Sequence, residues 1–168
     1  MKVSWKKIAV FLIILIISLF GFLMWYKYAY SMEIAEPFEV NSPLLEQKLL
    51  IATQGSDYKD KVVDGLVEKL RDSSIYIKVI DVSSLPNIEE DDFTAIVVIH
   101  NWELQKPPKV VEQFLKQSKN IEKIVVLATS GGSDTSMEGI DGISGESIVS
   151  EIPEKVNQLM SKLEPLLK

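Results

Sequence analysis

The stretch Lys48-Leu49-Leu50-Ile51-Ala52-Thr53 decides the fold class of this chain of 168 residues. Its aliphatic residues follow one another without polar residues at alternate positions, which indicates a β-strand that is covered on both faces. Residues 93–100 and 121–129 have the same aliphatic character. Strands of this kind are typical of a parallel sheet between two layers of helices. The sequence therefore predicts an α/β domain.

Weaker strands and helices complete the pattern. Residues 75–82 alternate more, with Lys78 in the middle, and this favours a strand at the edge of the sheet. Residues 140–143 would add a short fifth strand. We expect an α/β three-layer sandwich with a mostly parallel five-stranded sheet over residues 47–168. Apolar residues at helical spacing predict three helices: residues 60–70, a helix opened by Pro107-Pro108, and one from about Ser150.

The N-terminal segment is hydrophobic along its whole length. Residues 8–26 carry no charge, and Ser18 is their one clearly polar residue. At about 1.5 Å per residue they would form a helix of roughly 28 Å, close to the thickness of the hydrocarbon core. We predict a transmembrane helix over residues 8–28, after a basic flank at residues 1–7, with residues 8–26 in the bilayer. A cleaved signal peptide is the alternative, because Ala29-Tyr30-Ser31 has the small residues of a cleavage site.

Charges around this segment predict its orientation. Three lysines precede it, whereas Lys27 is the only basic residue between it and Lys48. Because basic flanks stay in the cytoplasm, we expect a cytoplasmic N-terminus and an extracytoplasmic C-terminal domain. A secreted domain is the alternative if the segment is cleaved. Residues 29–46 would be a linker of mostly extended chain, rich in Glu and Pro.

The chain beyond residue 28 is strongly acidic. It holds 24 acidic and 14 basic side chains, a net charge of −10. This excludes nucleic acid as a partner, because nucleic-acid binding relies on Lys and Arg that neutralise phosphates. An acidic surface instead suits a basic partner protein. The absence of cysteine excludes disulfides, thiol chemistry and iron–sulfur ligation.

Three loops would meet at one edge of the predicted sheet. In open parallel sheets, ligands bind beyond the carboxyl ends of the strands, near the switch in strand order. The loops at these ends are residues 53–59, 100–108 and 130–134. We expect any ligand of this domain to bind there.

The second and third loops resemble those of the flavodoxin-like superfamily, which includes flavodoxins and FMN-dependent reductases. Residues 95–102, Ala-Ile-Val-Val-Ile-His-Asn-Trp, and the proline-led segment 107–115 are similar to the family's third strand and the helix after it. The turn at residues 129–132 resembles the family's other flavin-flanking turn. The resemblance covers about residues 48–168. It implies the strand order 2-1-3-4-5, FMN as cofactor and Trp102 as the aromatic that stacks on the flavin; rim packing is the alternative role for Trp102.

The first loop departs from the family's phosphate-binding pattern, Ser/Thr-x-Thr-Gly-x-Thr. In Thr53-Gln54-Gly55-Ser56-Asp57-Tyr58 the glycine comes one place early and Tyr58 replaces the last threonine. Asp57 would repel a phosphate, and Lys59 would partly offset that repulsion. The alternative is that Ser56 or Asp57 only caps the following helix. The residues that the resemblance implies for cofactor binding are Thr53, Gln54, Gly55, Ser56, Lys59, Asn101, Trp102, Ser130, Gly131 and Gly132.

Other polar residues give weaker signals. His100 is the only histidine, so we expect no histidine-based metal cluster, and at a strand end it is either a structural residue or a base. Glu103 and Asp134 would lie near each other, but nothing marks them as an acid/base pair. The acidic run at residues 89–92 is interpreted as a solvated loop. We assign no catalytic residue and no metal ligand.

Two functions follow from these patterns. The first is a membrane-anchored FMN protein, either an electron carrier or a flavin-dependent reductase, that meets a basic redox partner protein. The second is an extracytoplasmic binding or interaction module on the same scaffold, without flavin. We expect the first, because the second and third loops match the family, and whether the protein is an enzyme is left open.

Overall fold

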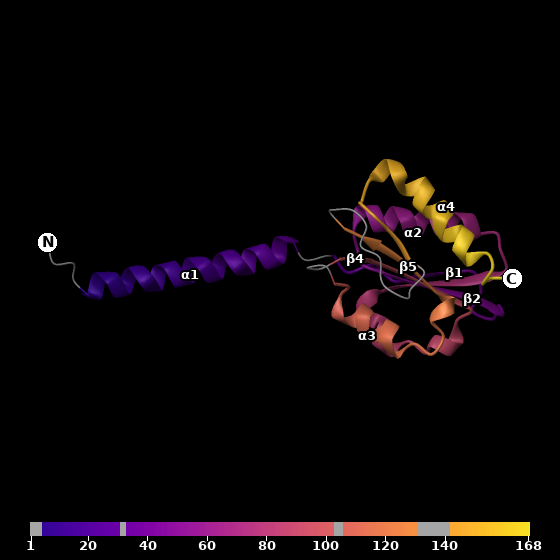
Figure 1. Cartoon of the computed structure of the whole chain (residues 1–168), viewed down its shortest axis with the longest axis horizontal. Helices are drawn as coiled ribbons and strands as arrows, with labels where there is room; N and C mark the ends of the chain where they lie inside the picture. The colour runs from indigo at the N-terminus through magenta and orange to yellow at the C-terminus, as the bar shows by residue number, and fades with distance from the viewer. Residues whose placement is uncertain (1–4, 31–32, 103–105, 131–141) are drawn as a thin grey trace. The chain divides into compact units, whose positions relative to one another are not determined.

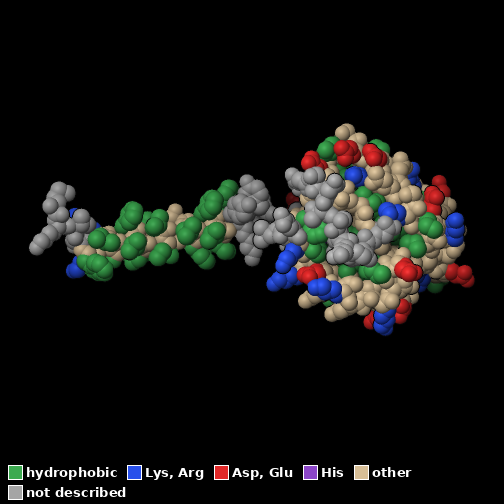
Figure 2. All heavy atoms as spheres, viewed as in Figure 1, with side chains coloured by type: hydrophobic (Ala, Val, Ile, Leu, Met, Phe, Trp, Pro, Cys, Tyr) green, Lys and Arg blue, Asp and Glu red, His purple; other side chains and the backbone are tan. Residues whose placement is uncertain are grey.

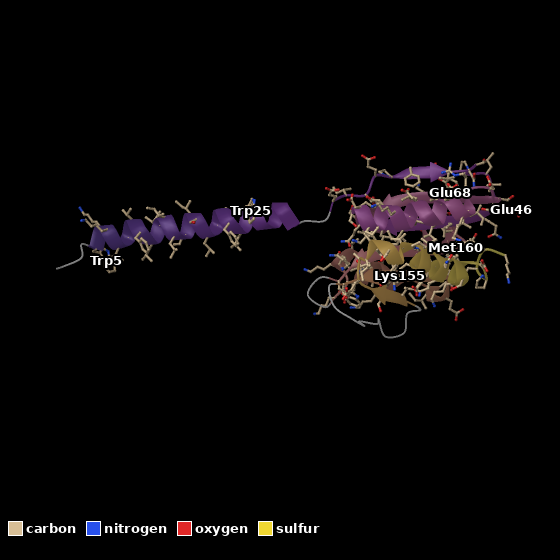
Figure 3. All side chains as sticks on the ribbon, turned by 90° about the horizontal axis from the view of Figure 1, so that it is seen from above. Trp5, Trp25, Glu46, Glu68, Lys155 and Met160 are labelled. Atoms are coloured by element: carbon tan, nitrogen blue, oxygen red, sulfur yellow. The ribbon has the colours of Figure 1, made fainter. Side chains whose placement is uncertain are left out.

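The computed structural model describes residues 5–30, 33–102, 106–130 and 142–168, which fall into two units, residues 1–32 and 33–168. The first unit is one helix, α1 (Trp5–Tyr30), with hydrophobic side chains along it (Figure 2). Side chains project from several sides of α1 between Trp5 and Trp25 (Figure 3). The helix is long and apolar enough to cross a membrane.

The second unit contains a sheet of six described strands, one more than predicted. Their order across the sheet is β1-β3-β2-β4-β5-β6. The five strands from β2 to β6 are parallel to one another. Their order, β3-β2-β4-β5-β6, corresponds to the order 2-1-3-4-5 of the predicted strands. The strands are β1 (Phe38–Val40), β2 (Gln47–Thr53), β3 (Ile75–Asp81), β4 (Ala95–Asn101), β5 (Ile124–Thr129) and β6 (Gly142–Gly145).

Helices cover both faces of this sheet, so the three-layer α/β sandwich is confirmed (Figure 1). Helices α2 (Asp57–Leu70) and α4 (Ile152–Leu163) lie on one face, and α3 (Lys109–Gln117) lies on the other. Alternate residues of β2 enter two separate cores: Leu49 and Ile51 pack with α2 and α4, and Leu50 and Ala52 pack with α3. Burial on both faces explains the continuous aliphatic sequence of this strand.

The short strand β1 lies in the predicted linker, and β3 is therefore not an edge strand. β1 pairs antiparallel with β3, from Phe38 opposite Val79 to Val40 opposite Ile77. After β1 the chain turns at Asn41, whose φ of 68° is left-handed, a conformation that asparagine tolerates better than most residues. The Asn41 side-chain amide donates to the carbonyl of Ile75 at 2.8 Å. Phe38 and Val40 favour a strand, but three residues are too few to predict one, so non-local pairing and this side-chain bond fix the segment.

The residues before β1 are also part of the domain. The amide of Gly55 donates to the carbonyl of Glu33 at 2.8 Å, and the amide of Ala35 donates to the carboxylate of Asp81 at 3.0 Å. We call residues 33–41 the strap. The strap crosses the carboxyl ends of β2 and β3, so this part of the predicted linker over residues 29–46 is extended, as expected, but is docked on the domain.

Element boundaries differ from the sequence prediction by a few residues. Helix α2 begins at Asp57, three residues before the predicted start, because Ser56 caps it. The fifth parallel strand, β6, covers Gly142–Gly145 and so extends two residues beyond the end of the predicted stretch, whose residues 140 and 141 lie outside the described ranges. A four-residue strand gives too short a pattern to fix its register from sequence alone.

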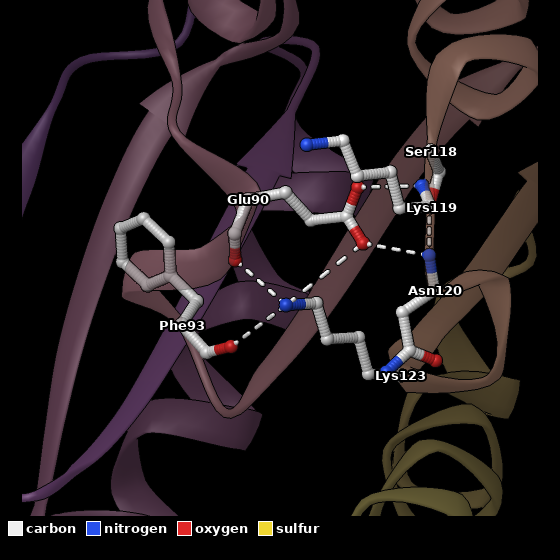
Figure 4. A network of polar contacts seen from close by, with 6 residues as sticks. All are labelled: Glu90, Phe93, Ser118, Lys119, Asn120 and Lys123. Atoms are coloured by element: carbon white, nitrogen blue, oxygen red, sulfur yellow. Dashed lines mark hydrogen bonds and ion pairs between the residues drawn. The ribbon is translucent and has the colours of Figure 1, made fainter.

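Glu90, in the acidic run interpreted as solvated, is instead a structural residue (Figure 4). Its side chain is 14% exposed, and its carboxylate accepts from the amides of Lys119 and Asn120, both at 3.2 Å. Lys123 lies 3.8 Å from the carboxylate and donates to the carbonyls of Glu90 and Phe93. Because its partners are mainly backbone groups far away in sequence, no local pattern reveals this role.

The contact between α2 and α4 depends on a glycine. A Cβ built on Gly65 would lie 2.8 Å from Cγ2 of Val156. We expect Gly65→Leu to cost about 1–3 kcal/mol of stability through overpacking. Adding Val156→Ala should restore part of it. Urea unfolding of the full chain in detergent measures both effects. An unchanged stability in Gly65→Leu would contradict the packing seen here.

Candidate functional site

The carboxyl ends of β2, β4 and β5 meet at one edge of the sheet, and their loops are joined by hydrogen bonds. The amide of Asn101 donates to the side-chain oxygen of Gln54 at 2.8 Å. The amide of Trp102 donates to the carbonyl of Thr129 at 2.8 Å, and that of Ser130 donates to the carbonyl of Gly145 at 3.0 Å. The structure thus brings the described residues of all three loops to one place.

The first loop is short and closed. Thr53, Gln54 and Gly55 are all buried. The Thr53 hydroxyl donates to the carbonyl of Gln54 at 3.1 Å, and the Gln54 amide donates to the carbonyl of Ile99 at 3.1 Å. The Gly55 amide is held by the strap, and a Cβ on Gly55 would lie 2.6 Å from the Glu33 carbonyl oxygen. Their polar groups are therefore engaged within the protein.

Ser56 and Lys59 belong to the start of α2. The Ser56 hydroxyl accepts from the amide of Lys59 at 3.3 Å, which is the capping role weighed as the alternative. The Lys59 residue is only 2% exposed. Burial lowers the pKa of its amine to about 8, and the neighbouring Asp60 carboxylate opposes that shift. At pH 7 this amine is charged on a side chain that is almost wholly buried, and burial of a charge costs free energy.

The end of β4 carries three successive residues with unsatisfied buried polar atoms. These atoms are Nε2 of His100, Oδ1 of Asn101 and Nε1 of Trp102, each without a hydrogen-bond partner in the described structure. Buried polar atoms in proteins are nearly always paired. In sheets of this type, ligands bind at this edge. Three neighbouring residues with unpaired polar atoms therefore indicate a place where a ligand or a bound water forms the missing hydrogen bonds.

The protonation of His100 follows from its surroundings. Burial lowers its pKa, the hydrogen bond to the Asn101 carbonyl opposes the shift, and the charge of Lys59 adds to it. The ring is therefore neutral at pH 7. Nδ1 lies 2.9 Å from the carbonyl oxygen of Asn101 and must carry the proton to donate there. Nε2 is left as an acceptor that lacks a donor.

Trp102 is half-buried and packs on the α3-side core. Its ring meets the ring of His100 edge to face, with centroids 5.9 Å apart and planes at 70°. This supports the rim-packing alternative, while stacking on a flavin stays a prediction. Of the other predicted site residues, Ser130 is placed at the edge, whereas Gly131, Gly132, Glu103 and Asp134 lie outside the described residues.

Sequence reasoning missed two residues near this edge. Tyr58 has a buried hydroxyl without a described partner, and burial raises its pKa, with a smaller contribution from Glu151. Lys155 of α4 donates to the carbonyl of Ser144 at 3.2 Å. Helical periodicity marked neither, because it does not show that a tyrosine hydroxyl is buried or that a lysine reaches the carbonyl of the preceding strand. Within the described ranges, no group of three or more His, Asp or Glu is placed to hold a metal ion.

The first loop does not fit the phosphate of FMN. A phosphate needs free amides and hydroxyls at a helix N-terminus. Here the Gly55 amide is bonded to Glu33, the Ser56 hydroxyl caps α2, and the Thr53 hydroxyl is turned to the neighbouring carbonyl. The first turn of α2 also carries acidic side chains that repel a phosphate. The sequence departure in this loop is thus matched by its geometry.

Solved structures similar to this chain are flavodoxin-like. A flavodoxin from the domain Archaea is 12% identical with a TM-score of 0.50, covering 71% of this chain and 99% of that one. A mutant flavo di-iron protein from Thermotoga maritima is 12% identical with a TM-score of 0.52, covering 73% of this chain and 36% of that one. This chain thus spans only about a third of the second protein's length.

At such identities the likeness shows the fold alone, and it confirms the flavodoxin-like fold that the second and third loops predicted. No family model matches the sequence, and a search of curated proteins finds no match.

Proposed function

We propose that this chain is a membrane-anchored binding protein, whose flavodoxin-like domain takes a small polar ligand at the carboxyl edge of its sheet. The observation that carries the proposal is the row of unsatisfied buried atoms on His100, Asn101 and Trp102. Helix α1 would be the anchor, since its length and apolar composition suit a bilayer. The three lysines before residue 8 support a cytoplasmic N-terminus and an extracytoplasmic domain.

The unpaired donor and acceptor atoms at this edge indicate which groups the ligand carries. Nε2 of His100 and Oδ1 of Asn101 are acceptors, so the ligand donates hydrogen bonds to them. The indole of Trp102 is a donor, and the charged amine of Lys59 adds a positive field. The ligand therefore combines donors with an acceptor or a negative charge. Desolvated bonds of this kind are strong and selective, because a ligand without the matching group leaves them unpaired.

Flavin is the second candidate ligand. Trp102 lies where the resemblance implies a stacking aromatic, and the similar structures include a flavodoxin and a flavo di-iron protein. The isoalloxazine ring offers donors and acceptors side by side, which suits the polar atoms of this edge. The phosphate of FMN lacks a place in the first loop. A flavin bound here would therefore be held by its ring, and FMN would gain nothing over riboflavin.

Fluorescence and NMR titrations of the full chain in lipid nanodiscs test these ligands. With Trp5→Phe and Trp25→Phe, Trp102 is the single tryptophan, and His100 is the single histidine for isotope labelling. We expect micromolar FMN to leave both signals unchanged. Quenching of Trp102 by riboflavin and FMN with equal affinity would favour the second candidate. FMN binding that is at least about tenfold tighter than riboflavin binding would contradict the closed phosphate loop.

Native mass spectrometry tests the binding proposal itself. The chain purified from membranes in mild detergent should carry a bound small molecule, and His100→Phe should lose it. The control is Glu122→Gln, an exposed position away from the edge. Absence of any bound molecule, with His100 resonances insensitive to small-molecule extracts, would overturn the proposal.

A further inference from the structure

A groove of about 360 Å³ lies between the strap and α2. Its apolar lining includes Phe38 from β1, Val63 from α2 and Val79 from β3. Phe38 is 39% exposed, and Ile34 of the strap is 78% exposed beside it. The groove therefore offers apolar surface to a partner, in a volume that suits one or two side chains.

Carboxylates surround this apolar lining. The residues of the groove include four acidic side chains and no Lys, Arg or His. None of the four forms an ion pair within the described part of the chain. Unpaired charges beside an apolar surface create a negative field that an incoming cation meets before contact. The four residues are Glu33, Glu36, Asp60 and Asp64.

The groove lies against the loop where this fold type would hold a phosphate. Thr53 and Gly55 are both among its lining residues. The strap is bonded to that loop through the amide of Gly55, and its carboxylates, Glu33 and Glu36, line the groove beside it. The local electrostatics are thus opposite to those of a phosphate site: an anion is repelled here and a cation is favoured.

We infer that this groove docks a basic segment of a partner protein, in which an apolar side chain flanked by Lys or Arg enters between the strap and α2. Charge complementarity selects this occupant: nucleic acid, phosphates and anionic lipid headgroups are repelled. A second copy of a domain with a net charge of −10 is repelled too. The groove does not include His100, Asn101 or Trp102. Asp60 acts on the charge of Lys59, whereas Glu36 belongs to the groove alone, so Glu36→Gln separates loss of peptide binding from loss of the proposed ligand.

Peptide titration of the full chain in phosphatidylcholine nanodiscs tests the inference, with empty nanodiscs as background. The probe is a short synthetic peptide of leucine and lysine, measured by calorimetry at low and physiological salt. We expect binding that weakens with salt, because the carboxylates are exposed. Asp60→Asn with Asp64→Asn should weaken it by about tenfold or more. Asp91→Asn with Asp92→Asn, the same charge change at exposed positions outside the groove, should change it by less than about twofold.

Two further variants separate the groove from folding and from net charge. Glu36→Gln lies outside any helix, so it keeps the test valid if the α2 double variant unfolds. Phe38→Ala should also weaken binding, since it removes apolar lining. Equal losses in the groove and control pairs would overturn the inference, and so would equal binding of a leucine–glutamine peptide. Equally tight binding of spermine, or no peptide binding at all, would overturn it too.

Discussion

Lys59→Met is expected to make the domain more stable at pH 7 and, at the same time, unable to bind the ligand proposed at His100, Asn101 and Trp102. The side chain of Lys59 is almost wholly buried, and desolvation raises the free energy of its charged form. Methionine keeps most of the side-chain volume and removes the charge. We expect the midpoint of thermal unfolding to rise by roughly 3–8 °C at pH 7.

The effect should depend on pH with a defined sign. The pKa of Lys59 is lowered to about 8 in the folded protein, against 10.5 for the ordinary side chain. Between these values the unfolded chain holds a proton that the folded chain has released, so stability rises with pH. The penalty is therefore complete below pH 8 and is relieved as the pH rises towards 10.5. The advantage of Lys59→Met should shrink accordingly between pH 7 and pH 10.

Three measurements check this prediction. Thermal unfolding at pH 7 and pH 10 should be compared with Lys61→Met, an exposed position on the same helix where no such effect is expected. The pKa of His100 should rise in Lys59→Met, because the charge of Lys59 lowers it. Any bound small molecule should be lost. A loss of stability at pH 7 would mean that the buried charge is satisfied within the protein and is not held for a ligand.

Gly55→Ala is expected to cause the largest loss of stability of the changes considered. The added Cβ would meet the carbonyl oxygen of Glu33 at 2.6 Å and its carbonyl carbon at 2.8 Å. These are backbone atoms, so the strap itself must move. Overpacking and loss of the hydrogen bond between Gly55 and Glu33 together should cost about 2–4 kcal/mol.

Urea unfolding and limited proteolysis measure this effect on the full chain. Displacement of the strap should also speed protease cleavage within residues 33–41. Gly21→Ala is the matched control, since a Cβ there meets nothing within 4 Å. Wild-type stability together with wild-type cleavage in Gly55→Ala would show that the strap is not tightly docked.

The sequence by itself determined the hydrophobic helix and the layered α/β domain. Both depend on local patterns: an uncharged run over residues 8–26, and aliphatic strands such as Lys48 to Thr53 with helical stripes between them. A strand that is buried on both faces, or a helix that spans a bilayer, needs an apolar residue at nearly every position. Such continuous apolar runs are recognised from the sequence without knowing what the segment packs against.

Only the tertiary structure decided the strap, the closed first loop and the unsatisfied edge. The strap is fixed by pairing with β3 and by bonds from Glu33 to Gly55 and from Ala35 to Asp81, each made across many residues of sequence. Its residues include three Glu and one Pro, types that are depleted in strands, and the strand-favouring Phe38 and Val40 are too few to predict a strand. The burial of Lys59 and the orphan atom on His100 likewise depend on neighbours from other elements. Non-local contacts of this kind produce no periodic pattern in the sequence. The flavodoxin-like resemblance therefore predicted the fold, but not that contacts with the strap close the first loop against a phosphate.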